Sequence, residues 1–333
     1  MSSSSLQTYS KRTLYFDVLR VVAAFGVIVI HVAGTEWHEL DVMSTGWLAA
    51  HVWHGITRWC VPIFVMVSGA LHLSSLSKSG TKSSGGGLPV TAIRRAVVAF
   101  VFWSAAYVAF TRFTLGWDLS KRDMLIGFIE GKIHLWFLPM ICGLYLITPL
   151  LRPLAADEGL LRLFLALSCV FSFVLPSLRA TWDCLTPRIT DDLLLRVVGA
   201  FFRFLENTRF HFTLEYSSYY LLGYALHTHP MNKRQSVVSA LLALVLFFLA
   251  VATSASASRI TGVPTDTTYA YMTLPTLFGS VALFGAAQWL CGYGAVSCDM
   301  KTDAITMQGS FKQSTATKQT LHISLQSACS WLI

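Results

Sequence analysis

The chain has 333 residues, of which 54% are hydrophobic and only 13% are charged, and its mean hydropathy is +0.57. Soluble domains carry about 25% charged residues, so this composition excludes an ordinary soluble protein and indicates a polytopic membrane protein. The formal net charge of +8 is explained by membrane orientation and lipid headgroups, so we expect a lipid bilayer and no nucleic acid as partner.

Eight apolar windows predict membrane spans, because about 20 apolar residues in a helix cross a bilayer. The windows cover residues 14–33, 48–73, 93–111, 134–151, 162–178, 212–227, 236–256 and 268–290. Strands with open edges leave unpaired backbone groups in lipid, so we expect an all-α helix bundle. Residues 1–13 would then be a cytoplasmic N-terminus, 14–291 a membrane domain, and 292–333 a polar, poorly ordered tail.

The distribution of basic residues favours a cytoplasmic N-terminus. In that orientation the short outer loop 34–47 contains no Lys or Arg, as the positive-inside rule requires. The second window contains His51, His54 and Arg58, so its first part is expected to be interfacial.

The first span carries three ionisable residues, Asp17, Arg20 and His31. A charged side chain in lipid costs several kcal/mol unless it faces a polar interior, so these residues predict a functional site. Arg20 and His31 are eleven residues apart, a spacing that returns to within about 20° of the same helix face after a rise of about 16 Å. One face therefore displays a fixed cation and a titratable base.

Four stretches, in this order, resemble the membrane-bound acyltransferase 3 family. They are YFDVLRVVAAFGVIVIHV, RWCVPIFVMVSGALHL, HLWFLPMICGLYLITPLLRPL and EYSSYYLLGYAL. The first contains an arginine and a histidine separated by ten residues, and the second is similar to the family's VP-F-x-x-SG-x-L signature. Bacterial inner-membrane sugar O-acetyltransferases, including the enterobacterial common antigen O-acetyltransferase, are the subgroup that these stretches resemble most.

The resemblance implies transfer of an acetyl group from cytoplasmic acetyl-CoA to a hydroxyl of an extracytoplasmic or lipid-linked saccharide, in the inner membrane. It implies no bound cofactor, since acetyl-CoA is the acyl donor. The seven cysteines are odd in number and lack metal-ligand spacing, so they are expected to pack among apolar residues without forming a metal site.

Each main candidate residue has a catalytic and a structural interpretation. His31 is the expected general base, or a transient acetyl carrier; otherwise it satisfies polar contacts inside the bundle. Arg20 is expected to bind the phosphate or pantetheine region of CoA, and a salt bridge to Asp17 is compatible with that role. Arg94 and Arg95 match the basic pair where the family is thought to meet CoA, or they are positive-inside anchors.

Four further candidates are weaker. Ser68 either bonds the thioester or the base, or packs with Gly69 where two helices approach closely. Glu36, His134 and Trp136 are placed on the acceptor side, although loop polarity or anchoring at the membrane interface also explains them. The segment 191–210 has apolar residues at helical spacing, which predicts an interfacial amphipathic helix that packs on the surface or contributes to the acceptor site.

Two other functions are compatible with charges inside spans. One is a saccharide transporter or flippase, although the sequence has no internal repeat that would support it. The other is an inactive truncated family member, because relatives usually continue with about two more spans where this chain has its polar tail.

Overall fold

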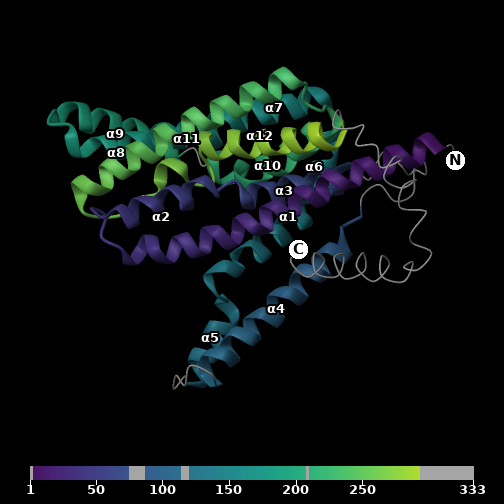
Figure 1. Ribbon diagram of the computed structural model, residues 1–333, viewed down its shortest axis with the longest axis horizontal. Helices are drawn as coiled ribbons and strands as arrows, with labels where there is room; N and C mark the ends of the chain where they lie inside the picture. Colours follow the sequence, from purple (N-terminus) through teal and green to yellow (C-terminus); the bar gives the residue numbers. More distant parts are fainter. Residues whose placement is uncertain (1–2, 75–86, 114–119, 208–209, 293–333) are drawn as a thin grey trace, which may run out of the picture. The chain divides into compact units, whose positions relative to one another are not determined.

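The computed structural model describes residues 3–74, 87–113, 120–207 and 210–292 (Figure 1). The predicted tail 292–333 therefore lies outside the described residues, except for Gly292. The described residues are mostly helical and contain no strand, which confirms the all-α prediction. They belong to two compact units, one formed by the chain up to Leu71 and from Asp157 onward, the other running from His72 to Ala156.

The first unit is a bundle in which α1 packs on α2 and α12, and α11 packs on α12, α8 and α2 (Figure 1). Its helices are α1 (Ser3–Glu39), α2 (Thr45–Ile56), most of α3 (Cys60–Leu73), α7 (Glu158–Ser168), the π-helix η3 (Cys169–Val174), α8 (Leu175–Leu185), η4 (Thr186–Arg188), α9 (Asp192–Asn207), α10 (Phe210–Thr228), α11 (Lys233–Thr261), η5 (Thr267–Tyr269) and α12 (Leu274–Gly292).

The second unit consists of α4 (Val90–Phe113), α5 (Lys121–Glu130), η2 (Ile133–Trp136) and α6 (Phe137–Ala156). Helix α4 packs on both α5 and α6. Helix α5 begins with a capping box in which the side chains of Ser120 and Asp123 satisfy each other's backbone N–H groups. It ends at Gly131, whose positive φ of 68° suits a residue without a Cβ.

Among the described residues, seven segments are long and apolar enough to span a membrane, one fewer than the eight predicted windows. They are Leu14–Glu39, Thr45–Leu73, Val90–Phe113, His134–Ala156, Glu158–Arg188, Lys233–Thr261 and Thr267–Cys291. The remaining window, 212–227, is helical as α10, but its backbone departs from helical geometry at Glu215 and it contains the buried polar residues Ser217 and Ser218. Helix α10 therefore forms as predicted, but it is less apolar than the seven candidate spans.

Helices α3 and α10 touch through two glycines. A Cβ at Gly69 would lie 1.8 Å from the carbonyl oxygen of Tyr220, and a Cβ at Gly223 would lie 2.0 Å from that of Met66. Any larger residue would force the two backbones apart, so these glycines permit the close approach that small residues give membrane helices. The structure thus shows that Gly69 packs directly against the backbone of α10.

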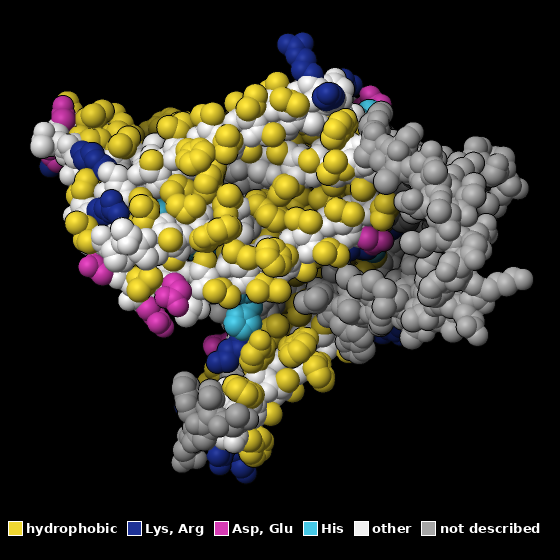
Figure 2. All heavy atoms as spheres, viewed as in Figure 1, with side chains coloured by type: hydrophobic (Ala, Val, Ile, Leu, Met, Phe, Trp, Pro, Cys, Tyr) yellow, Lys and Arg dark blue, Asp and Glu magenta, His cyan; other side chains and the backbone are white. Residues whose placement is uncertain are grey.

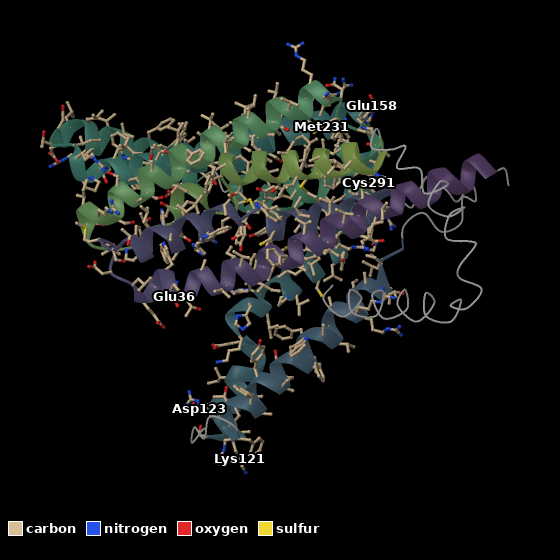
Figure 3. The ribbon with its side chains drawn as sticks, viewed as in Figure 1. Glu36, Lys121, Asp123, Glu158, Met231 and Cys291 are labelled. Atoms are coloured by element: carbon tan, nitrogen blue, oxygen red, sulfur yellow. The ribbon has the colours of Figure 1, made fainter. Side chains whose placement is uncertain are left out.

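The outer surface of the first unit is apolar along the middle of its helices. Phe25, Ile28 and Val32 are exposed on α1, and the face of α11 and α12 in Figure 2 is covered by hydrophobic side chains. Charged side chains gather toward the ends of these helices (Figure 2). Glu158 and Cys291 lie at one end and Glu36 at the opposite end (Figure 3), as expected of helices that cross a bilayer.

Candidate functional site

Helix α1 is continuous from Ser3 to Glu39, so Arg20 and His31 share one side of one helix, as their spacing predicts. The packed face of α1 is apolar and includes Leu19, Ala23 and Ile30. Arg20 and His31 lie at the margin of this face, where Arg20 is half-buried and His31 is exposed. The helix therefore presents both side chains beside the packed interior of the unit.

Arg20 is paired with the carboxylate one turn before it. Its Nη1 lies 3.2 Å from Oδ1 of Asp17, whose side chain is 66% exposed. The Nε of Arg20 is buried and makes no hydrogen bond to a described residue. The ion pair leaves most of the guanidinium's five donors uncommitted to Asp17, so the structural and ligand-binding interpretations of Arg20 remain compatible.

The part of α1 just beyond His31 faces a histidine of α2. A Cβ at Gly34 would lie 3.7 Å from both Nε2 and Cδ2 of His54, and the ring of Trp37 lies 5.3 Å from that of His54 and 4.8 Å from that of His38. His54 is 8% exposed. The end of α1 that follows His31 therefore packs against His54 of α2.

His51, one turn earlier on α2, lies at the centre of a buried hydrogen-bond network. Trp37 Nε1 donates to His51 Nδ1 at 2.8 Å, and the hydroxyl of Tyr269 lies 2.9 Å from the same atom. Because Nδ1 accepts, the ring proton lies on Nε2, which is 2.9 Å from Oγ of Ser254. Ser254 in turn donates to the carbonyl oxygen of Ala250 at 2.8 Å. The network therefore fixes a neutral imidazole in one tautomer.

Arg58 connects this network to a charge. Its Nη2 lies 3.1 Å from Nε2 of His54 and also pairs with the carboxylate of Asp266. Its guanidinium stacks near the rings of Tyr269 and Tyr271, at 5.8 and 5.1 Å from their centres. Since Nε2 of His54 accepts from Arg58, its Nδ1 carries the proton, and that atom is buried without a hydrogen-bond partner among the described residues.

The sequence predicted that the first part of the window 48–73 lies at the membrane interface. The contacts of its polar residues inside the unit explain them without that position. His51 is fully buried and bonded to Ser254 of α11, the ring of His54 lies 5.3 Å from that of Trp37 on α1, and Arg58 pairs with Asp266, which caps η5. The three-residue spacing of His51 and His54 places both on one face of α2, which is the sequence signal for an inward-facing pair, and Arg58 follows in the turn after this helix. Asp266 and Tyr269 had no such signal, because they follow more than 200 residues later.

The remaining predicted site residues fall into two groups. In the first unit, Ser68 is buried on α3 and Glu36 is exposed near the end of α1. In the second unit, Arg94 and Arg95 are exposed in the first turns of α4, and the exposed His134 has its ring 5.4 Å from that of Tyr107.

Trp136 is also exposed in the second unit, at the end of η2. The structure therefore brings Arg20, His31, Glu36 and Ser68 into one unit, and Arg94, Arg95, His134 and Trp136 into the other.

Comparison with protein families identifies the chain. The profile described as an acyltransferase domain, that of the acyltransferase 3 family, matches residues 13–301. The chain belongs to the acyltransferase 3 family. Its seven candidate spans and its family together make it a multi-pass membrane acyltransferase. Comparison with curated proteins and with solved structures gives no match.

The match covers the arginine, the histidine and the α2 cluster of this acyltransferase in a single domain. It is a match to the family as a whole and does not distinguish the sugar O-acetyltransferase subgroup. The family match alone therefore does not identify the acyl donor, the acceptor or the roles of individual residues.

Proposed function

We propose that this acyltransferase moves an acetyl group from acetyl-CoA to a hydroxyl of an extracytoplasmic or lipid-linked saccharide in the inner membrane, with its N-terminus in the cytoplasm. The observation that carries this proposal is the contact between α1 and the buried His54 at Gly34, about one turn after His31 on a family-matching first span, with Arg58 bonded to the same imidazole. Buried ionisable groups inside a membrane domain are costly and mark sites of function.

In the proposed reaction His31 is the general base. It takes the proton from the acceptor hydroxyl while the hydroxyl oxygen attacks the thioester carbonyl carbon. The carbon–sulfur bond then breaks, CoA leaves as a thiolate that regains a proton, and the acetyl group ends as an ester on the saccharide.

Arg20 and the arginines of α4 are the proposed donor-binding groups. A guanidinium forms bidentate hydrogen bonds with phosphate oxygens, which CoA carries. Arg20 lies about three turns before His31 on the same helix, so one helix would serve the donor near its start and the acceptor near its end. Arg94 and Arg95 would add positive charge for the nucleotide part of CoA.

The experiment follows radiolabelled acetyl from acetyl-CoA into a cell-envelope polysaccharide fraction, using the purified full chain in nanodiscs. We expect His31→Ala to lose transfer by at least about 100-fold, the usual contribution of a general base, and Arg20→Ala to raise the KM for acetyl-CoA. His229→Ala, an exposed histidine at the other end of the unit, is the matched control and should retain wild-type transfer.

Two outcomes would reject parts of this proposal. Acetyl transfer that survives His31→Ala in well-folded protein would remove His31 from the reaction. Saccharide translocation that needs no acetyl-CoA, without any acyl transfer, would instead favour a transporter.

A further inference from the structure

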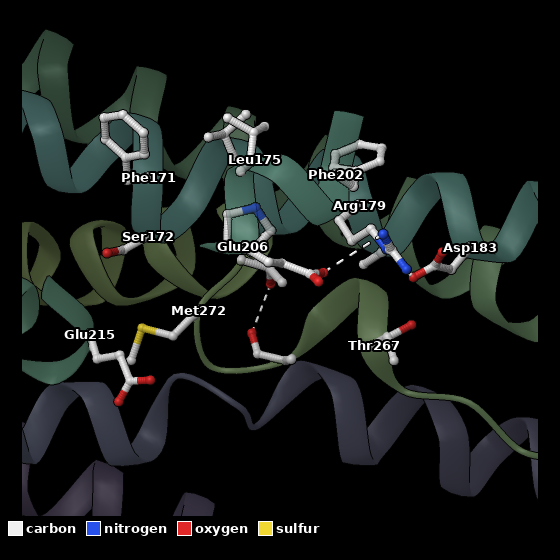
Figure 4. Close-up of a pocket in the computed structure, with 15 residues that line it drawn as sticks. Phe171, Ser172, Leu175, Arg179, Asp183, Phe202, Glu206, Glu215, Thr267 and Met272 are labelled. Atoms are coloured by element: carbon white, nitrogen blue, oxygen red, sulfur yellow. Dashed lines mark hydrogen bonds and ion pairs between the residues drawn. The ribbon is translucent and has the colours of Figure 1, made fainter. Parts of the chain in front are cut away.

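A pocket lies in the first unit where η3, α8, α9 and residues 267–273 meet (Figure 4). Its volume of about 380 Å³ falls within the range of small-molecule sites. Apolar side chains, among them Phe171, Leu175 and Met272, form much of its lining. The amphipathic helix α9 supplies Phe202 and Glu206, so this helix contributes to a pocket as well as to the surface.

The charged groups of the pocket are mainly acidic. Asp183, Glu206 and Glu215 supply three carboxyl groups, and Arg179 supplies one guanidinium. Arg179 Nε donates to Asp183 at 2.8 Å, its Nη1 lies 3.7 Å from Glu206, and its guanidinium lies 5.3 Å from the centre of the Phe202 ring (Figure 4). Among the described lining residues, the one arginine is thus already engaged by carboxylates, and an anionic ligand would meet more negative than positive charge from these residues.

Ser172 contributes a buried hydroxyl group to the pocket wall. Its side chain is 1% exposed, and its Oγ makes no hydrogen bond to a described residue. It lies in the π-helix η3, a geometry that occurs often at functional sites. A buried hydroxyl without a partner is unfavourable, and a ligand hydroxyl in the pocket would satisfy it.

The pocket shares a wall with the histidine cluster. Thr267, Ala270 and Met272 line the pocket, whereas Tyr269, between them in the chain, reaches His51 at 2.9 Å. Tyr271, in the same segment, lies under the guanidinium of Arg58. A ligand in the pocket would therefore contact the chain segment that holds the histidine cluster.

We infer that this pocket binds the saccharide acceptor and selects an uncharged, polyhydroxylated ring over an acidic sugar. This inference rests on the proposed function. Ring hydroxyls donate to the carboxylates and pair with Ser172, while the apolar face of the ring packs against side chains such as Phe202. The carboxyl groups of the pocket repel a sugar that carries a carboxylate or phosphate, so they disfavour acidic acceptors.

The test measures binding by the full chain in nanodiscs without acetyl-CoA, and acetyl transfer separately. The probes are a neutral hexose oligosaccharide and the matched hexuronic acid oligosaccharide. We expect the neutral probe to bind more tightly, and Ser172→Ala to weaken it about 5- to 10-fold, the effect of one hydrogen bond. Ser168→Ala is the matched control, because Ser168 is equally buried, also lacks a described partner for its Oγ, and does not line the pocket.

A charge variant tests selectivity. Glu206→Gln is expected to reduce the preference for the neutral probe several-fold, whereas Glu158→Gln, at the far end of the unit (Figure 3), should leave it unchanged.

Equal binding of the two probes, unchanged binding in Ser172→Ala, or displacement of the neutral probe by a lipid chain would overturn the inference. Ser172-dependent binding without acetyl transfer would reject the proposed function alone. Acetyl transfer with a preference for the acidic probe would reject the pocket assignment alone.

Discussion

Arg58 and Asp266, 208 residues apart in the chain, form an ion pair that joins the turn between α2 and α3 to the start of η5. The Arg58 side chain is 13% exposed and that of Asp266 is 34% exposed, so the arginine is the more deeply buried partner. A buried charge is tolerated only when it is paired and hydrogen-bonded. The pair therefore holds the histidine cluster and the wall of the pocket in one arrangement.

Asp266→Asn should destabilise the folded protein, because it leaves the buried guanidinium of Arg58 without its counter-charge. We expect a loss of about 1–3 kcal/mol, below the value for fully buried pairs because Asp266 is partly exposed. The measurement is the thermal unfolding midpoint in detergent. The control is Arg162→Ala, which breaks a pair whose side chains are 78% and 71% exposed and should change stability by less than about 1 kcal/mol. Equal effects of the two variants would contradict the structural role of Asp266.

Gly69→Ala and Gly223→Ala should each reduce the yield of folded protein sharply. In both cases the added Cβ would lie within 2.0 Å of a backbone oxygen on the partner helix, and a backbone cannot move aside as a side chain can. Gly143→Ala is the control, since a Cβ there meets nothing within 4 Å, and alanine favours a helix by about 1 kcal/mol. Folded yield is measured by size-exclusion chromatography. A monodisperse Gly69→Ala variant with the wild-type unfolding temperature would refute the contact.

Trp37→Phe should destabilise the protein by about 1–3 kcal/mol, because it removes the N–H that donates to Nδ1 of His51 in a buried network. The matched control is Trp53→Phe on α2, whose side chain is 57% exposed. Thermal unfolding of both variants in the same detergent gives the comparison. A loss in Trp53→Phe as large as that in Trp37→Phe would show that the network adds little.

Much of the fold could be predicted from the sequence because membrane helices have a strong local signal. Length and apolar composition predicted the spans, and the spacing of Arg20 and His31 predicted their shared helix side. The window 212–227 was predicted as a span but is the helix α10, whose apolar content is lower than that of the seven candidate spans. Its break at Glu215 has no sequence signal that a propensity argument would detect.

The site was less predictable because its partners come from distant parts of the chain. His54 and Arg58 are only four residues apart in the sequence, but only the folded structure brings Asp266 and Tyr269 to them. The pocket likewise depends on the π-turn around Ser172 and on the packing of α9, which are set by tertiary contacts. Sequence reasoning therefore identified the helix that carries His31 and missed the side chains that surround it.

The contact of Gly34 with His54 gives a prediction for activity. Gly34→Ala should keep wild-type acyl transfer, since its Cβ would meet the imidazole at 3.7 Å, an ordinary van der Waals distance. Gly34→Leu should displace His54 and reduce kcat about 10-fold or more, because small misplacements of catalytic neighbours cost that much. Val32→Leu, which is 64% exposed on the same helix, controls for added bulk on α1. Both kcat and the unfolding midpoint are measured. Full activity in a folded Gly34→Leu variant would separate His54 from the reaction, whereas lost activity at unchanged stability would place the α1 and α2 contact within it.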